Sequence, residues 1–476
     1  MTQTLRWSPT THFVDGPHAI AVLNSIYLRP VYLGQGFAEL KRLHTSGASP
    51  RQSLDSLAVD PVARDDLTRA LIEAKVLLEP GSGETTTDEV AGGVKADRHL
   101  TELYLVVTGA CNFSCSHCLS GSDDTASAFF KTAMDEKTAV RAVELFTSVM
   151  DPGRANRVVF YGGEPLLRWP LMRRVMNEVR AHPNFGWGRG QVRTKVITNG
   201  SLLSMEKAEE LGRNQVEVVL SFDGPDWLTK LSRPSRSKTA YPQLAQVVDL
   251  LRTGGVEPSL SITLTESTVR HLDAILNWVT DEVTVPVVFC ILKQQEELLY
   301  TDVFAEQASD AVIAAYRRIL ASGGEEQRLS RMLGCVRDNV PYVQSCFAQG
   351  AHQIVVDQNG RIGVCQGFLE DYQFFHANVW QPHLAAKLFD TPAMKHWEDR
   401  IAVNIEPCRN CASVGICGGG CPASASKGGK TIYNIDLGHC RTSKKVLPFL
   451  VWEVLNVPEL RDRFSLPAYD AFGLSA

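Results

Sequence analysis

The sequence contains no apolar run approaching the roughly 18 residues that a helix needs to cross a bilayer. Its first sixteen residues lack the apolar segment of a signal peptide. It also lacks a strong charge of either sign, because 48 Lys and Arg against 53 Asp and Glu give a net charge of −5. These absences argue against a membrane partner and against bulk binding to nucleic acid. We therefore expect a cytoplasmic protein, whose thiols stay reduced.

Cysteine is absent from the first 110 residues, although the chain contains 12. Three cysteines lie at positions 111, 115 and 118, and seven lie between 346 and 440. In a reduced compartment, clusters with short fixed spacing indicate metal ligation and not disulfides. Cys290 and Cys335 stand apart from both clusters, and we expect Cys290 to belong to the core.

Short apolar runs alternate with helical segments between residues 100 and 300. The runs begin at 103, 157, 192, 216, 259 and 285, and the helical candidates are 135–150, 171–181, 204–213, 242–252 and 269–279. This alternation is typical of a parallel sheet covered by helices, which is an α/β fold. Six units are too few for a closed eightfold barrel. We therefore predict a partial, open TIM-like (β/α)6 barrel.

The flanking segments divide the rest of the chain. Residues 1–80 predict a small unit with a strand over 18–24 and helices over 37–43, 51–57 and 63–78. Residues 81–99 have the composition of a linker. Residues 301–340 form a bridging segment with a helix over 304–322. Residues 341–445 are rich in Cys and Gly, and we expect them to fold around metal without a normal core. Residues 446–476 are assigned to a closing helix, over 446–460, and a tail.

Cys111, Cys115 and Cys118 form a C-x3-C-x2-C pattern directly after the first predicted strand. Three thiolates on one loop can bind one face of a 4Fe–4S cluster and leave its fourth iron open to a chelating small molecule. The alternative is a zinc site completed by a distant fourth ligand. Gly162-Gly163-Glu164-Pro165 follows the second strand, where glycine lets the backbone approach a ligand and a carboxylate suits an ammonium group.

Together, CNFSCSHC and the following GGEP resemble the signature of the radical S-adenosylmethionine (SAM) enzymes. The resemblance implies that GGEP holds the SAM amino group, that the end of the fourth strand holds its ribose and carboxylate, and that His117 lies near adenine. It further implies reductive cleavage of SAM to a 5′-deoxyadenosyl radical that abstracts a substrate hydrogen. The SAM-binding residues that it assigns are Gly162, Gly163, Glu164, Pro165, Ser221, Asp223, Arg233 and His117. Thr198-Asn199-Gly200 is interpreted as a turn.

The C-terminal cysteines resemble the pattern of a SPASM domain, with two zinc knuckles as the alternative. The resemblance implies two auxiliary 4Fe–4S clusters, three clusters in all. One cluster would use Cys408, Cys411, Cys417 and Cys440. The other would use Cys346, Cys365 and Cys421, and its fourth ligand stays open between Cys335, His352, another donor and a vacancy that a substrate could occupy. We favour Cys335 or a vacancy slightly over His352.

The N-terminal unit faintly resembles the winged-helix-like domains that bind leader peptides in maturases of ribosomally made peptides. The leading hypothesis is a maturase that forms an oxidative cross-link, thioether or carbon–carbon, in a precursor peptide. Its expected partners are that precursor, with its leader, and a small electron donor such as flavodoxin or ferredoxin. Sulfatase-maturing enzymes, which make formylglycine, are the alternative, although Gln366 replaces their proposed basic Asp. A further alternative is a non-catalytic electron carrier or zinc-stabilised binding protein. No catalytic base is assigned.

Overall fold

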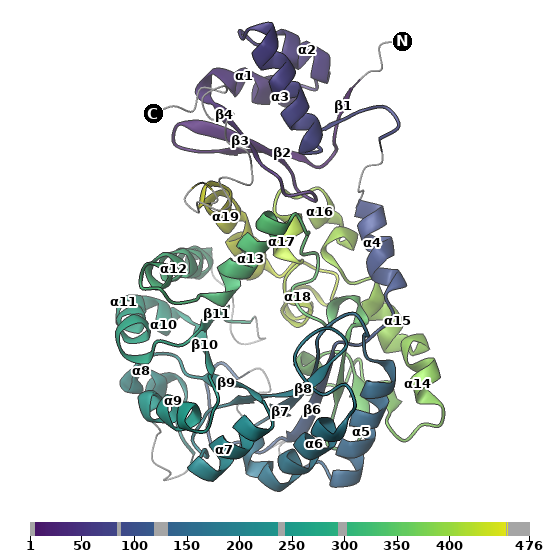
Figure 1. Ribbon diagram of the computed structural model, residues 1–476, viewed down its shortest axis with the longest axis vertical. Coiled ribbons are helices and arrows are strands. Elements are labelled where there is room, and N and C mark those ends of the chain that lie inside the picture. The colour runs from purple at the N-terminus through teal and green to yellow at the C-terminus, as the bar shows by residue number, and fades with distance from the viewer. Residues whose placement is uncertain are drawn as a thin grey trace.

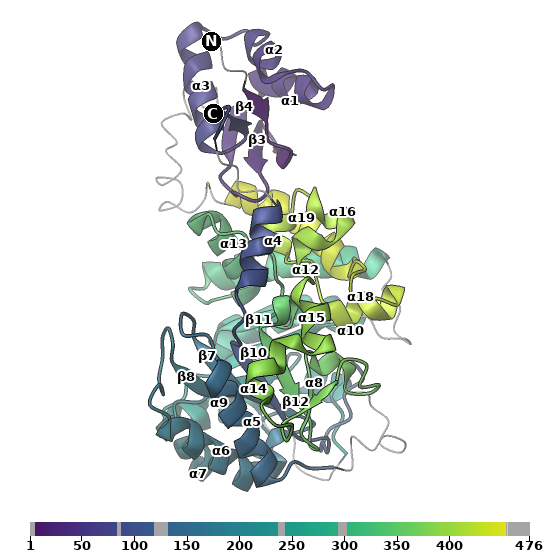
Figure 2. The same cartoon turned by 90° about the vertical axis from the view of Figure 1, so that its right-hand side faces the viewer.

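The computed structural model describes residues 5–82, 87–118, 132–236, 243–293, 302–453 and 455. The molecule is elongated, with a small N-terminal unit at one end, the barrel at the other and much of the C-terminal region between them (Figure 1, Figure 2). Within those ranges, the helices are too short or too polar to span a membrane.

Six parallel strands form the barrel sheet in sequential order, which confirms the predicted partial barrel. At least one helix lies between each strand and the next, as expected for crossover connections between neighbouring parallel strands. The strands are β6 (Glu102–Thr108), β7 (Asn156–Gly162), β8 (Val192–Thr198), β9 (Glu217–Ser221), β10 (Ser259–Leu264) and β11 (Val287–Ile291).

The helices of the barrel pack their apolar faces on this sheet, as α5 does with Ala142 and Phe146. The single helix expected over 269–279 is wrong, because His271 leaves helical geometry and separates two short helices. The helices are α5 (Glu136–Val149), α6 (Trp169–Ala181), α7 (Met205–Arg213), α8 (Asp226–Ser232), α9 (Leu244–Thr253), α10 (Glu266–Arg270), α11 (Leu272–Asn277), a π-helix (Trp278–Val283), α12 (Asp302–Ala321) and α13 (Gln327–Asp338).

The N-terminal unit has its own apolar core, built around residues such as Leu40 and Leu71. The helix expected to reach residue 78 ends at Glu73, because Lys75 has a φ of 55° and the chain turns into a strand. The elements are β1 (Arg6–Trp7), β2 (Thr11–Asp15), β3 (Ala19–Asn24), β4 (Val31–Gly34), α1 (Ala38–Thr45), α2 (Pro50–Asp55), α3 (Pro61–Glu73) and β5 (Leu77–Leu78). Strands β2, β3 and β4 form an antiparallel sheet, and β1 pairs with β5.

The segment 81–99, expected to be a linker, contains helix α4 (Thr87–Ala96). The linker interpretation was wrong for this part because three small apolar side chains recur on one helix face. Val90, Ala91 and Val94 pack against the buried Ile26 of the N-terminal unit and Val343 of the C-terminal region. The helix therefore lies between the two units and contacts both.

The C-terminal region extends the barrel sheet, an arrangement that was not predicted from the sequence. Strand β12 (Gln353–Val356) pairs in parallel with β6, and β13 (Arg361–Gly363) and β14 (Ala377–Asn378) follow it to the edge. The expectation that this region lacks a core was wrong, since Trp397 and Ile416 are fully buried in the main core. Its helices are α14 (Leu384–Lys387), α15 (Pro392–Glu398), α16 (Glu406–Arg409), α17 (Val414–Cys417), α18 (Pro422–Gly429) and α19 (Leu437–Glu453).

Helix α19 begins nine residues earlier than the closing helix expected from residue 446. Cys440 therefore lies on a helix, within the segment that was expected to fold around metal. Residues 454 and 456–460 of the expected helix lie outside the described residues.

Candidate active site and cysteine groups

The loop that carries Cys111, Cys115 and Cys118 follows β6 at the carboxyl end of the barrel strands. Its backbone is held by a segment more than 100 residues away in the sequence. Ser114 N donates to Pro234 O at 2.8 Å, and Ser116 N donates to Ser232 O at 3.2 Å. The end of α8 therefore fixes the conformation of the cysteine loop.

The three cysteines line one cavity of about 220 Å³. The opposite wall is made by Gly162, Gly163 and Glu164 after β7, and by residues at the ends of β8, β9 and β10. Because parallel strands all end at this edge, side chains far apart in sequence meet there. Three thiols around one cavity are ligands of the kind that hold iron–sulfur clusters.

Gly162 and Gly163 are required by the close approach of β7 to β6. A Cβ on Gly162, whose φ is 135°, would lie 2.0 Å from Thr108 O. A Cβ on Gly163 would lie 2.1 Å from Ala110 O. Any side chain would push the cysteine loop away from the end of β7, so these glycines set the width of the cavity.

Glu164 is buried, and its carboxylate accepts three hydrogen bonds from neighbouring groups of the protein. Its carboxylate accepts from Leu166 N at 3.0 Å, Thr198 Oγ1 at 2.7 Å and Asn199 N at 2.9 Å. Burial raises the pKa of Glu164, and these donors oppose that rise. The side chain assigned to the SAM ammonium thus also ties the end of β7 to the end of β8.

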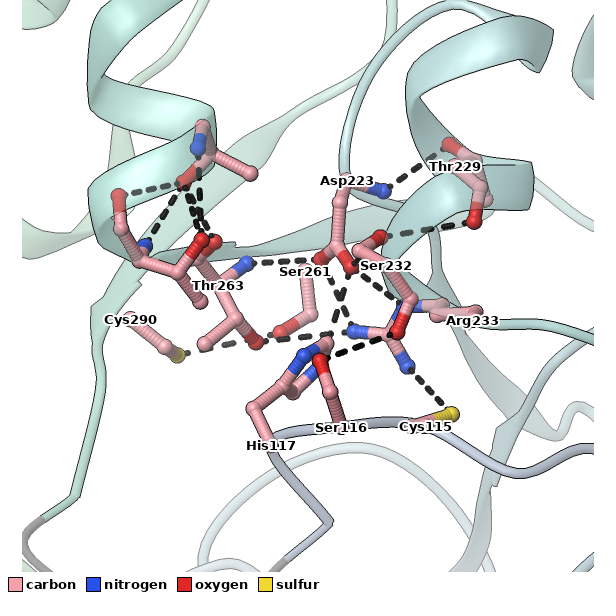
Figure 3. Close-up of polar contacts among 12 residues, drawn as sticks. Cys115, Ser116, His117, Asp223, Thr229, Ser232, Arg233, Ser261, Thr263 and Cys290 are labelled. Carbon is pink, nitrogen blue, oxygen red and sulfur yellow. Dashed lines mark hydrogen bonds and ion pairs between the residues drawn. The ribbon is translucent and has the colours of Figure 1, made fainter. Parts of the chain in front are cut away.

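Asp223 and Arg233 form a bidentate ion pair beside the cavity (Figure 3). Arg233 Nε donates to Asp223 Oδ2 at 2.8 Å and Nη2 donates to Oδ1 at 2.9 Å. Arg233 Nη1 lies 4.0 Å from Cys115 Sγ. Burial alone would raise the pKa of Asp223, but Arg233 and His117 lower it below its ordinary value. Asp223 itself is fully buried and lies behind Arg233, while Arg233 and Ser221 line the cavity.

His117 lines the same cavity with a nearly buried ring. Its Nε2 lies 3.6 Å from Asp223 Oδ2, too far for a good hydrogen bond. Neither ring nitrogen has a hydrogen-bond partner among the described residues. Burial lowers the pKa of His117 to about 4, so the ring is neutral. A buried donor and acceptor facing a cavity are suited to a polar ligand there.

Burial also controls the thiols of this group. It raises the pKa of Cys111 to about 12 and that of Cys115 to about 11, although Arg233 opposes the shift at Cys115. Without metal these side chains stay protonated at neutral pH. Metal binding would therefore release their protons.

The C-terminal cysteines separate into two further groups. Cys408, Cys411, Cys417 and Cys440 line a second, small cavity. Burial and then Cys421 and Cys346 raise the pKa of Cys365, which places Cys346, Cys365 and Cys421 together. In the described part of the chain no three His, Cys, Asp or Glu side chains converge on a single ion-sized point. The seven cysteines from positions 346 to 440 thus fall into two sets, and Gly418–Gly420 connect Cys417 of one set to Cys421 of the other.

The structure does not bring Cys335 or His352 to the set formed by the C-terminal cysteines 346, 365 and 421. Cys335 Sγ lies on α13 and donates to Arg331 O at 3.3 Å. His352 Nδ1 lies 3.0 Å from His99 O, and its charged neighbours are Asp97, Arg154 and Asp151. Gln366 accepts from Gln353 Nε2 at 3.0 Å and offers no basic group. Cys290 is the second-last residue of β11, and its Sγ lies 3.7 Å from Ser261 Oγ. It is half-buried and lies outside the apolar core, so the expectation that it belongs to the core was wrong.

Several polar residues of the cavity were missed in the sequence. Thr198 and Asn199, interpreted only as a turn, bind Glu164 and line the cavity. Arg236 and Thr263 also line it. The available signal was position, since Thr198, Asn199 and Thr263 lie at or near the ends of β8 and β10, as GGEP does at β7. Arg236 gave no such signal, because it lies in an irregular segment.

Comparisons with known proteins agree with this architecture. Residues 105–279 match the model of the Radical SAM superfamily. The radical SAM cyclopropyl synthase TigE of Paramaledivibacter caminithermalis is 20% identical over 383 residues, which cover 76% of this chain and 76% of that protein.

Solved structures share the fold at low identity. A structure of anSMEcpe with bound AdoMet has a TM-score of 0.61 at 18% identity, and the match covers 75% of this chain and 100% of that one. Streptococcus suis SuiB bound to S-adenosylmethionine has a TM-score of 0.52 at 13% identity, covering 90% of this chain and 98% of that one. The second match extends over more of this chain than the first does.

Proposed function

Residues 105–279 form a radical SAM domain, and from that premise we propose that the chain is a maturase that oxidatively cross-links a ribosomally made precursor peptide. The observation that carries the proposal is the cavity in which Cys111, Cys115 and Cys118 face the glycines and carboxylate that end β7. Three thiols and an open cavity suit a 4Fe–4S cluster with one iron left for SAM. Bound together, the cluster and SAM supply the radical that removes a substrate hydrogen.

The protein residues bind and orient in this proposal. Arg233 and Arg236 place positive charge on the cavity wall, where a ligand carboxylate would be held. Asp223 fixes the plane of Arg233 through two hydrogen bonds. His117 supplies the polar ring edge that lacks a partner among the described residues. Gly162 and Gly163 keep the backbone close to the ligand.

The other cysteine groups fit auxiliary 4Fe–4S clusters of a SPASM domain. Cys408, Cys411, Cys417 and Cys440 would complete one cluster. Cys346, Cys365 and Cys421 would hold the second, and we propose that its remaining iron position is open to substrate, since Cys335 and His352 face elsewhere. Such clusters would supply an acceptor for the second electron that a net oxidation releases.

A peptide substrate is favoured by the relatives and by the N-terminal unit. Solved structures of SuiB include one bound to the precursor peptide SuiA, and those of anSMEcpe include one with the Cp18Cys peptide. In this chain, β2, β3 and β4 form a three-stranded sheet with strand edges at β2 and β4. An extended leader peptide could add a strand to such an edge.

Formation of a cyclopropyl group is a second candidate, because the relative TigE is a cyclopropyl synthase. Both reactions remove two hydrogen atoms, but cyclopropane formation joins carbons within one residue. A cross-link joins two residues. Formylglycine formation remains less favoured, since Gln366 cannot accept a proton.

The test uses anaerobic full-length protein with SAM, a strong reductant and the precursor peptide encoded beside its gene. We expect 5′-deoxyadenosine, and a peptide that loses two hydrogens and resists fragmentation between two linked residues. The Cys115→Ala variant should produce neither. Loss of hydrogen confined to one residue would indicate cyclopropane formation, and a peptide aldehyde would indicate formylglycine. Bound zinc with no cleavage of SAM would contradict the enzymatic proposal and favour a binding protein.

A further inference from the structure

Arg400 is a fully buried charged side chain in the C-terminal region. It lies just after α15, and its exposed fraction is 0%. A buried guanidinium destabilises the fold unless a carboxylate or several acceptors surround it. In the part of the chain that the structure describes, no carboxylate forms an ion pair with Arg400. Its charge therefore requires another explanation.

Two carbonyl groups hold this guanidinium in one orientation. Nε donates to Ile432 O, and Nη2 donates to Gly419 O at 3.1 Å. Nη1 has no hydrogen-bond partner among the described residues. A Cβ on Gly419 would lie 3.1 Å from Nη1, so this nitrogen lies directly against the glycine. One nitrogen of a fixed, buried cation is thus left without an acceptor among the described residues.

The segment that Arg400 contacts joins the two C-terminal cysteine groups. Gly418, Gly419 and Gly420 all have positive φ, between 68° and 76°, and they connect Cys417 to Cys421. Cys417 belongs to one group and Cys421 to the other. Burial lowers the pKa of Arg400, and the thiols that oppose this shift are Cys346, Cys408 and Cys421. Cysteines of both groups therefore lie near the guanidinium.

We infer that Arg400 is a positioning residue shared by the two proposed auxiliary clusters, where it fixes the glycine segment between them and makes both clusters easier to reduce. The inference rests on the proposed function, since it requires both clusters. A reduced cluster carries one more negative charge than an oxidised one. A nearby positive charge in a buried, low-dielectric site stabilises that reduced form and raises the reduction potential. Guanidinium stays charged in proteins, so the effect persists at all working pH values.

The experiment is a redox titration of anaerobic full-length protein, followed by electron paramagnetic resonance. Arg400→Gln removes the charge and keeps a hydrogen-bond donor, whereas Arg400→Lys keeps the charge. Lys395→Gln on α15 is the matched control, because it removes a charge whose side chain is 56% exposed. We expect Arg400→Gln to shift both auxiliary midpoints to more negative potential, with Arg400→Lys and Lys395→Gln close to wild type. The cluster whose signal changes on addition of SAM should not shift in any variant.

The outcomes separate this inference from the proposed function. Wild-type protein that contains no iron and does not cleave SAM would overturn both. Wild-type protein that cleaves SAM with the iron of only one cluster would overturn the inference and leave the reaction proposed at the barrel cavity in place. Wild-type protein with three clusters, together with an unchanged Arg400→Gln variant, would overturn only the inference. Equal shifts in Arg400→Gln and Arg400→Lys would also overturn it, since shape and not charge would then matter. If the Arg400→Gln variant loses iron, the Arg400→Lys variant decides the question. An Arg400→Lys protein with full iron content and wild-type midpoint potentials supports the inference, whereas an Arg400→Lys protein that also loses iron rejects it.

Discussion

The carbonyl of Ser25 in the N-terminal unit lies directly against Gly415 in helix α17. A Cβ on Gly415 would lie 2.2 Å from Ser25 O and 3.0 Å from Leu28 Cδ2. The same short helix ends at Cys417, one of the proposed cluster ligands. Tyr32 and Trp452 add a second contact, through ring centroids 5.4 Å apart. The small N-terminal unit is therefore packed directly on an element that carries a proposed cluster ligand.

Gly415→Ala should weaken this contact and disturb the neighbouring cysteine group. The added methyl group must displace the backbone of either Ser25 or α17, and such overpacking costs about 1–3 kcal/mol. We expect a lower unfolding temperature and partial loss of iron. Gly92→Ala on α4 is the control, because its Cβ would meet nothing within 4 Å. Equal unfolding temperatures for the two variants would show that the contact does not constrain the fold.

Replacement of the cysteines should follow the three groups seen in the structure. If each group holds one 4Fe–4S cluster, intact protein contains about twelve irons and loss of any one group leaves about eight. Alanine at Cys111, Cys115 and Cys118 should also abolish SAM cleavage. Cys335→Ala should keep all the iron. Iron and sulfide analysis of anaerobic protein measures the cluster content of each variant. Loss of about four irons from Cys335→Ala would identify Cys335 as a cluster ligand.

Asp223→Asn should destabilise the protein and weaken SAM binding. The substitution removes the negative charge that forms two hydrogen bonds with the buried Arg233 guanidinium, and breaking a buried pair costs about 3–5 kcal/mol. Glu266→Gln, which breaks an exposed pair with Arg270, should cost at most about 0.5 kcal/mol. Denaturant unfolding and SAM titration compare the two. A similar small cost in both variants would contradict a positioning role for Asp223.

Acid should loosen the N-terminal unit, because two of its histidines have lowered pKa values in the folded chain. Burial and then His44 lower the pKa of His12, and burial lowers the pKa of His44. Both side chains have a pKa of about 6.5 in an unfolded chain, so unfolding takes up protons below that value. The stability that depends on neutral rings is complete above about pH 6.5 and falls as the pH is lowered.

Hydrogen exchange measured by mass spectrometry, corrected for its intrinsic pH dependence, tests whether acid destabilises the N-terminal unit. We expect faster exchange in residues 11–34 at about pH 5.5 than at about pH 7.5. His12→Phe should flatten the difference, because it removes one titrating group whose Nε2 has no partner among the described residues. The same pH dependence in wild type and His12→Phe would assign the effect to other groups.

The sequence predicted the barrel correctly because each strand and helix carried its own local pattern. Apolar runs and helical periodicity alternate without interruption from β6 to β11, and short crossovers allow few other topologies. GGEP follows the second strand and the cysteine loop follows the first. The two segments could be predicted to lie close together, since parallel strands end at the same edge of a sheet. The pairing of β12 with β6 was not predictable in this way, because a four-residue strand with three apolar side chains carries no information about a partner about 250 positions earlier.

Residue types and spacing determined the chemistry that this chain can support: three thiols on one loop, a glycine-rich strand end and a further set of clustered cysteines. Only the tertiary structure decided which side chains face the same space. In the structure, Asp223 pairs with Arg233, and Glu164 connects the end of β7 to the end of β8 through hydrogen bonds. The polar contacts of Cys335 and His352 lie elsewhere than at the C-terminal set of three cysteines. The reason is that ligand identity is a local property of the sequence, whereas convergence depends on contacts between segments far apart along the chain.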